Sequence, residues 1–182
     1  MTDAFFQAAF CQPPKVAGRQ LRPFSLSHVV LLNGMGSGFW DCEKARRSDF
    51  LAAVLICSRT HKQNAKALFG GRQSFIRLVL WSLFWPNSRL VRERAVFKDY
   101  LADYTTMPEH WDDGTQGAGF RCPWTFHFAM NLTSHFGHTM DEAWNAPVGL
   151  ARCLYDVWAE TQGDKSLISE REHELSKAVN EQ

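Results

Sequence analysis

The fold class follows from one stretch of the chain, Ser48-Asp49-Phe50-Leu51-Ala52-Ala53-Val54-Leu55-Ile56-Cys57-Ser58. Its apolar residues recur every three or four positions, which is the spacing of one buried face of a helix. Ser48 precedes the apolar run and is predicted to be the N-cap, because its side chain can accept a hydrogen bond from a free backbone N–H. A buried α-helix is therefore expected here, and the rest of the chain must supply elements that cover it.

Comparable helical patterns lie on both sides of this stretch. Ser25 predicts the N-cap of a helix over 26–33, and the glycines at 34, 36 and 38 are expected to end that helix. Thr139 and Glu142 fit a capping box, in which each residue satisfies the other's backbone. The remaining helices are expected at 3–10, 61–69 (continuing the first stretch after a kink), 74–85, 88–104, 123–136 and 148–162. The apolar positions predicted for the helix at 88–104 are Leu90, Val91, Ala95, Val96, Tyr100, Leu101 and Tyr104.

A small β-hairpin is expected within the N-terminal arm, 1–24. Gly18-Arg19 is predicted to form its turn, with Val16 and Leu21 on one side. A long loop is expected over 105–119, and a polar helix or tail over 165–182. The sequence thus predicts a mainly α protein, with one domain over 1–182 that forms an irregular bundle of about six to eight helices.

The charge balance bears on the class of partner. The chain has 182 residues and a net charge of +1, from 20 basic and 19 acidic residues, which argues mildly against a specific nucleic-acid binder. Basic residues gather at 44–47 and at 89–94, and both groups are interpreted as solvated helix faces. Acidic residues gather between Glu160 and Glu181. This basic middle and acidic end could serve head-to-tail contacts between subunits.

Cysteine use and hydropathy bear on the compartment. The five cysteines are widely spaced and form no CxxC pair, so reduced intracellular thiols are expected. The first residues lack the basic segment of a secretory signal. The most apolar run, 75–85, is far shorter than the roughly 20 residues that a membrane span needs, and it is interpreted as a buried helix. A cytoplasmic protein without membrane association is therefore expected.

Metal binding is one alternative. Cys122, His127, His135 and His138 lie close together in the sequence and are residue types that zinc prefers. Their spacing is not that of paired zinc fingers, and on a helix His127 and His135 would lie about 12 Å apart along the axis. A site would need His135 and His138 with Cys122 or His110 folding back. Ordinary packed or surface side chains are the favoured interpretation, and no metal or cofactor is expected.

The cysteines, the glycines and the paired acids are the residues in which a catalytic motif would be expected. No recognisable motif surrounds any of the cysteines. The glycine-rich segment 34–38 lacks the Gly-Lys-Ser/Thr that completes a phosphate-binding loop. The acid pairs Asp112-Asp113 and Asp141-Glu142 are interpreted as solvated or capping residues. A non-enzymatic protein is therefore predicted.

Aromatic side chains are the most unusual part of the composition. They make up 13% of the chain and include seven tryptophans and fourteen phenylalanines. Such side chains need a core or an interface to cover them. Most are expected in the core, and a surplus is expected to bind a protein partner or a second copy of the chain. The residues predicted for this partner-binding surface are Trp40, Trp81, Trp85, Trp111 and Trp144.

Two further stretches carry a family resemblance. The first is Leu21-Arg22-Pro23-Phe24-Ser25-Leu26-Ser27-His28, and the second is Asp141-Glu142-Ala143-Trp144-Asn145-Ala146-Pro147, which leads through Ala151 to Glu160. Together they resemble small tail-assembly chaperone-like proteins of bacteriophages and prophages, over about a quarter of the chain. The resemblance implies a helical factor in the cytoplasm of a host bacterial cell that binds the hydrophobic tape-measure protein and has no catalytic residues. A small phage-type inhibitor or adaptor that blocks a host protein is the alternative.

Overall fold

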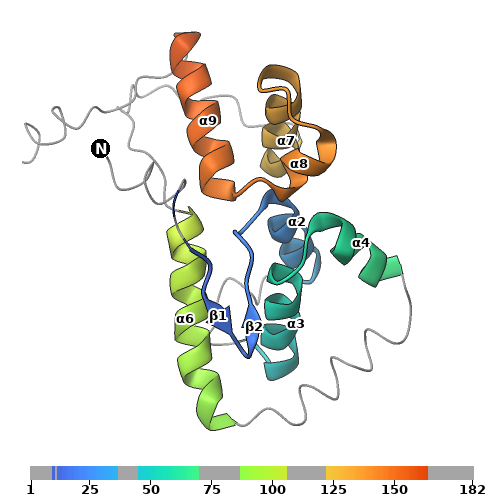
Figure 1. Ribbon diagram of the computed structural model, residues 1–182, viewed down its shortest axis with the longest axis vertical. Helices are drawn as coiled ribbons and strands as arrows, with labels where there is room; N and C mark the ends of the chain where they lie inside the picture. Colours follow the sequence, from blue (N-terminus) through green and yellow to red (C-terminus); the bar gives the residue numbers. More distant parts are fainter. Residues whose placement is uncertain (1–9, 11, 37–44, 70–86, 106–121, 164–182) are drawn as a thin grey trace, which may run out of the picture.

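The computed structural model describes residues 10, 12–36, 45–69, 87–105 and 122–163 (Figure 1). Within them the chain is mainly helical, with seven helices and one two-stranded hairpin, which confirms the predicted fold class. Some predicted elements lie outside the described residues: the helices at 3–10 (apart from its last residue) and 74–85, the loop after Thr105, and the helix or tail at 165–182.

The hairpin joins β1 (Lys15–Val16) to β2 (Arg19–Gln20) in antiparallel register, with Val16 opposite Arg19. Its turn residues are Ala17 and Gly18, with φ of 47° and 75°, so the predicted turn at Gly18-Arg19 is wrong by one residue. Two-residue turns with positive φ at both positions match the twist of the flanking strands. Val16 and Leu21 are both buried, as predicted.

α2 (Leu26–Gly34) begins after Ser25 and ends at the first of the three glycines, as predicted. The residue that completes its N-terminal cap is His28. The Ser25 N–H donates to Nδ1 of His28 over 3.2 Å, so an imidazole does what a Glu or Gln does in the usual capping box. The other ring nitrogen, Nε2, lies 2.8 Å from the Arg59 carbonyl oxygen, which ties α2 to the chain beyond the next helix.

α3 (Arg47–Cys57) is the buried helix that the opening stretch predicts, but Ser48 is not its cap. The cap residue is Arg46, two residues earlier, and the helix begins at Arg47. Ser48 therefore already has helical geometry, and its hydroxyl donates to Asp49 over 3.1 Å. α4 (His61–Phe69) is a separate helix rather than a kinked continuation. Thr60 and Gln63 explain the break, because each hydrogen-bonds the other's backbone at the start of α4.

α6 (Asn87–Thr105) is the longest helix of the described residues. Its buried side is formed by Phe97, Tyr100, Leu101 and Tyr104. The prediction placed Val91 on this side, but Val91 is 76% exposed. At 100° per residue, Val91 lies about 120° around the helix axis from the buried Phe97. Phe97 was not among the predicted apolar positions of this helix.

The last three helices form one group, at the upper end of the molecule in Figure 1. They are α7 (Trp124–His135), α8 (Met140–Asn145) and α9 (Val148–Thr161). The predicted capping box of α8 is confirmed, because the Thr139 N–H donates to Glu142 Oε2 over 2.8 Å and the Glu142 N–H donates back to Thr139 Oγ1 over 3.3 Å. Gly163, with φ of 79°, follows the end of α9.

The chain before α2 joins the two parts of the fold. The Val148 N–H donates to the Phe24 carbonyl over 2.8 Å, and the Leu26 N–H donates to the Ala146 carbonyl over 3.2 Å. This short antiparallel bridge is centred on Ser25 and Pro147 and holds the starts of α2 and α9 together. The two stretches that carry the family resemblance are therefore neighbours in space.

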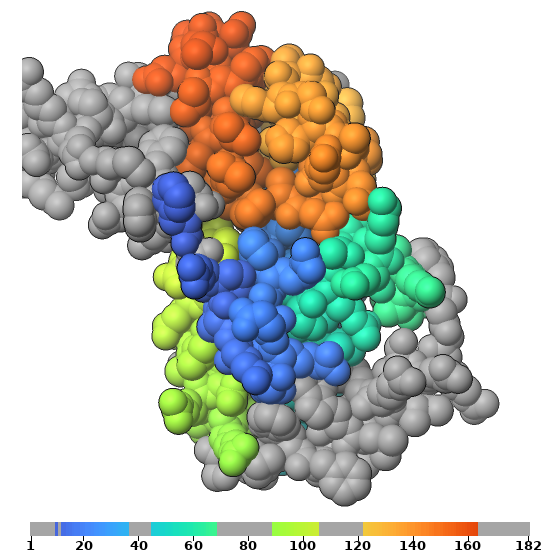
Figure 2. Space-filling view, viewed as in Figure 1, coloured from blue at the N-terminus to red at the C-terminus, as the bar shows by residue number. Residues whose placement is uncertain are grey.

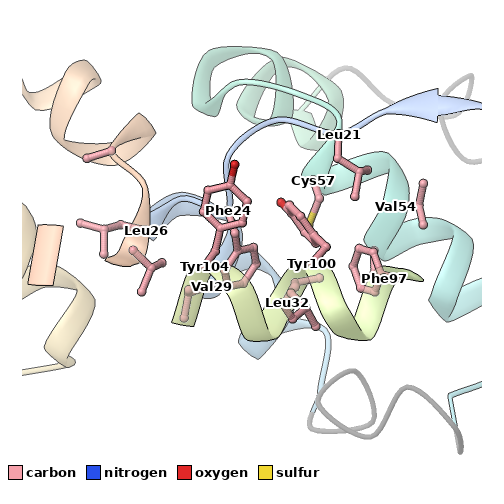
Figure 3. Packing of buried hydrophobic residues seen from close by; sticks show 14 of the residues in the cluster. Leu21, Phe24, Leu26, Val29, Leu32, Val54, Cys57, Phe97, Tyr100 and Tyr104 are labelled. Carbon is pink, nitrogen blue, oxygen red and sulfur yellow. The ribbon is translucent and has the colours of Figure 1, made fainter. Parts of the chain in front are cut away.

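The core lies where α2, α3 and α6 meet this segment, as Figure 3 shows. Phe24 meets Tyr100 edge to face, with ring centroids 5.9 Å apart, and Tyr100 meets Tyr104 at 5.3 Å. The Tyr100 hydroxyl donates to the Arg22 carbonyl over 2.8 Å, and the Arg22 N–H donates to the Cys57 carbonyl over 2.9 Å. Among the described residues, no helix combines the length and apolarity that a membrane span requires.

Candidate functional site

Trp144 is the one residue of the predicted partner-binding surface that the structure describes. Trp40, Trp81, Trp85 and Trp111 lie outside the described residues. Trp144 is half-buried on α8, and its inner side packs against the core. Two rings flank it: His61 of α4 stacks on it with centroids 5.9 Å apart, and Phe126 of α7 meets it edge to face at 5.0 Å.

The junction of α4 with α8 fixes the position of this tryptophan. The His61 N–H, at the start of α4, donates to Asn145 Oδ1 over 2.9 Å, so α8 caps α4 from across the fold. The Asn145 amide group in turn donates to the Asp141 carbonyl over 2.7 Å. Lys62 and Asp141 form an ion pair at 3.2 Å that faces solvent and adds little stability.

An apolar surface extends from Trp144 over α7 and α8. Phe126 and Met130 stand four residues apart on α7 and are 47% and 57% exposed. Met140, 50% exposed, stands four residues before Trp144 on α8. Residues at this spacing share one side of a helix. Because Phe126 near the start of α7 contacts Trp144 near the end of α8, and a short turn joins the helices, these four side chains form one surface, which we call the α7–α8 face.

A second row of rings lies between α7 and α9. His127 and Phe128 each meet Tyr155 with centroids 5.3 Å apart, and His135 stacks on Trp158 at 4.4 Å. Burial lowers the pKa of His127, which favours the neutral form of its ring. This row holds α7 against α9 and leaves the α7–α8 face pointing away from α9.

The candidate metal ligands that the structure describes are not brought together, and His110 lies outside the described residues. Cys122 is exposed before the start of α7, whereas His135 ends that helix, so about 18 Å of helix separates them. His135 is engaged with Trp158, and the His138 N–H donates to the Leu132 carbonyl over 3.1 Å. Among the described residues, no group of three His, Cys, Asp or Glu side chains is arranged to hold a metal ion.

Two of the described cysteines, Cys57 and Cys153, are buried. Burial and the nearby Asp156 carboxylate raise the pKa of the Cys153 thiol to about 11. That thiol is therefore protonated at neutral pH and is a poor nucleophile. Cys57 lies in the core at the end of α3, and its carbonyl accepts the Arg22 N–H.

Phe126, Met130 and Met140 were missed in the sequence. A signal was present, because α7 is apolar on two sides. Phe128 and Leu132 form its buried side, and Phe126 and Met130 repeat the same four-residue spacing on another. A helix with one covered face and a second apolar stripe indicates a surface that a partner can cover.

No protein-family model, curated protein or solved structure matches this chain. Its surface geometry and the sequence resemblance are therefore the basis for a functional proposal.

Proposed function

We propose that this protein is a non-enzymatic protein-binding factor that holds an apolar helical segment of another protein against the α7–α8 face. The supporting observation is the face itself: two pairs of large apolar side chains, on two adjacent helices, with three of the four about half exposed. Exposed apolar side chains that lie together favour an interaction surface, whereas scattered ones need no explanation.

The chemistry of the face suits a helix. An amphipathic helix presents apolar side chains at every third and fourth position, and these pack between two parallel or antiparallel helices of a receptor. Met130 and Met140 are unbranched and polarizable, so they adapt to side chains of different shape. Phe126 and Trp144 supply large rigid rings, which tend to contribute most to binding energy.

The face is also held in place before a partner arrives. Asn145 caps α4, and His61 of that helix stacks on Trp144. A surface that is already ordered loses less conformational entropy on binding. This favours a binding role for Trp144 beyond its contribution to packing.

The family resemblance supplies the class of partner. It implies that the bound segment belongs to the tape-measure protein of a phage or prophage tail, and that binding occurs in the cytoplasm of the host bacterium. Long apolar helices of such a partner would aggregate if left exposed, and a face of rings and thioethers can cover them. Trp144 belongs both to the stretch that carries the resemblance and to the face.

The test is co-expression of the full chain with the proposed partner, a phage or prophage tape-measure protein from the same genome. The wild type should keep that protein soluble and co-purify with it. Phe126→Ser with Met130→Ser should reduce the co-purified amount at least tenfold, because two lost anchors remove about 1.4 kcal/mol or more of binding free energy. The matched control is Val91→Ser, which changes an exposed apolar residue on α6 and should leave the yield unchanged.

Two results would contradict the proposal. One is an equal yield from the wild type and the double variant, with both folded by circular dichroism. The other is failure of the wild type to retain the tape-measure protein at all. Capture of a host protein through the same four residues would instead favour the inhibitor or adaptor alternative.

A further inference from the structure

A basic pocket lies between the hairpin and α6, on a different part of the molecule from the α7–α8 face. It has a volume of about 400 Å³ and is lined by Lys15, Arg89, Arg92, Glu93 and Val96. Figure 2 shows the N-terminal segment (blue) lying along α6 (yellow-green). A volume of this size is in the range of sites that take a small ligand or a few side chains of a peptide.

The pocket is built by a contact between its two walls. Glu93 Oε2 accepts the Ala17 N–H over 2.7 Å, which fixes the turn of the hairpin to α6. The four lining residues of α6 stand at positions 89, 92, 93 and 96, and this spacing places them in one stripe along the helix. Lys15 of β1 supplies the facing wall.

The lining has a surplus of positive charge. It contains three cations and one carboxylate, and that carboxylate already accepts a backbone hydrogen bond. Lys15, Arg89 and Arg92 are all exposed to solvent. Their neighbour Arg94 has a different role, because its guanidinium donates to the Ala45 carbonyl and lies over the Phe50 ring, 5.9 Å from the centroid.

Carboxylate groups fit this lining better than nucleic acid does. The fork of an arginine guanidinium pairs with the two oxygens of a carboxylate, and two such forks stand one turn apart on α6. Among the described residues, no aromatic ring lines the pocket on which a nucleic-acid base could stack. Val96 can pack against the methylene groups of a glutamate.

We propose that the pocket binds the acidic segment Glu170-Arg171-Glu172-His173-Glu174 of a second copy of this chain. Residues 164–182 contain five acidic and three basic side chains, and three of the acids fall within these five positions. The acidic surplus of this segment and the cationic surplus of the pocket have opposite signs, so the two are complementary in charge. The result is head-to-tail self-association that weakens as salt screens the charges.

The direct test is titration of a synthetic peptide of residues 164–182 into the full chain, followed by fluorescence anisotropy. The peptide should bind in 50 mM salt and bind at least fivefold more weakly in 300 mM salt. A peptide with Gln at 170, 172 and 174 should not bind. The variant Arg89→Glu/Arg92→Glu should not bind the peptide. The control variant Lys66→Glu reverses an exposed charge on α4 and should bind the peptide as the wild type does.

Analytical ultracentrifugation of the full chain gives a second readout. The mean mass should rise with concentration in low salt, and the Arg89→Glu/Arg92→Glu variant should stay monomeric. Mixing that variant with one carrying Lys at 170, 172 and 174 should restore association through the swapped charges.

A chain that is monomeric at every concentration would overturn the proposal. So would association that the double variant does not change, equal binding of the two peptides, or binding of single-stranded nucleic acid in place of the peptide.

Discussion

Two aromatic regions of this molecule use the same kind of contact under opposite conditions. Around Tyr100, the rings of Phe24 and Tyr104 meet it edge to face and are sealed from water. On the α7–α8 face, Phe126 meets Trp144 in the same geometry, but the surface stays about half exposed. Edge-to-face packing therefore does not mark the core, and the aromatic side chains of the described residues are divided between interior and surface.

The two regions also differ in their polar groups. In the sealed region, two buried polar side chains have partners: the Tyr100 hydroxyl donates to the Arg22 carbonyl, and His28 lies between the Ser25 N–H and the Arg59 carbonyl. A buried polar group without a partner would lose a large part of the stability that burial gives. On the α7–α8 face, the side chains of Phe126, Met130 and Met140 carry no hydrogen-bond donor, and only the Trp144 indole N–H needs a partner when the surface is covered.

The largest expected effect is the loss of a sealed ring. Phe24→Ala should lower the free energy of unfolding by about 3–5 kcal/mol, because it removes a fully buried ring and leaves a cavity. Phe126→Ala should lower it by less than about 1 kcal/mol, since solvent already reaches that ring. Urea denaturation of both variants measures the difference. Equal losses would mean that the α7–α8 face is part of the core.

Acidification should weaken the sealed region through His28. Burial lowers the pKa of His28 to about 4, against the ordinary 6.5 of an exposed histidine. Between these values the unfolded chain binds a proton that the folded chain excludes, so stability falls as the pH drops from 6.5 towards 4. From pH 7 to pH 4 the loss should be about 3 kcal/mol, at 1.36 kcal/mol per pKa unit.

The control for this pH effect is His28→Gln, because a glutamine can accept from Ser25 and donate to Arg59 without titrating. Denaturation at several pH values should show a shallower pH dependence in the variant than in the wild type. Identical slopes would show that His28 does not exclude the proton.

A smaller effect should follow from Tyr100→Phe. The variant keeps the ring but leaves the Arg22 carbonyl without the hydroxyl that it accepts from. The free energy of unfolding should fall by about 1–3 kcal/mol, as is usual for one buried group left unpaired. Chemical denaturation with unchanged near-ultraviolet dichroism would show that the fold is kept, and a loss near zero would mean that water replaces the hydroxyl.

The smallest effect concerns the start of α8. Thr139→Ala removes the hydroxyl that accepts the Glu142 N–H and should cost about 1 kcal/mol. Thr133→Ala is the matched control, because that hydroxyl only bonds back to carbonyls within α7 and should be close to neutral. Thermal unfolding of the two variants measures both, and equal changes would mean that the cap contributes nothing.

The sequence predicted local structure well where the signal is local. The caps at Ser25 and Thr139 depend on neighbouring residues, and both are in place. The predicted cap at Ser48 was wrong, because the helix begins earlier in the chain. The predicted burial of Val91 was also wrong, because the side of a helix that is buried depends on where the core lies. The pairing of Ser25 with Pro147 could not be foreseen, because it joins segments more than 120 residues apart through backbone groups that every sequence has.

The candidate site was predictable only in part. The high aromatic content predicted a binding surface, and Trp144 lies on one. Its neighbours Phe126 and Met130 were not predicted, because the sequence of α7 alone does not show which of its two apolar stripes the fold covers. The basic residues at 89 and 92 looked like an ordinary solvated face. They line a pocket only because the fold places Lys15 of the hairpin opposite them.

A photo-crosslinking residue at position 126 tests the binding role of the α7–α8 face most directly, with position 91 as the reference. During co-expression with the proposed partner, a phage tape-measure protein, irradiation should link position 126 to an apolar helical segment of that protein, identified by mass spectrometry, and leave position 91 unlinked. Equal crosslinking from both positions, or none from position 126, would contradict a binding role for this face.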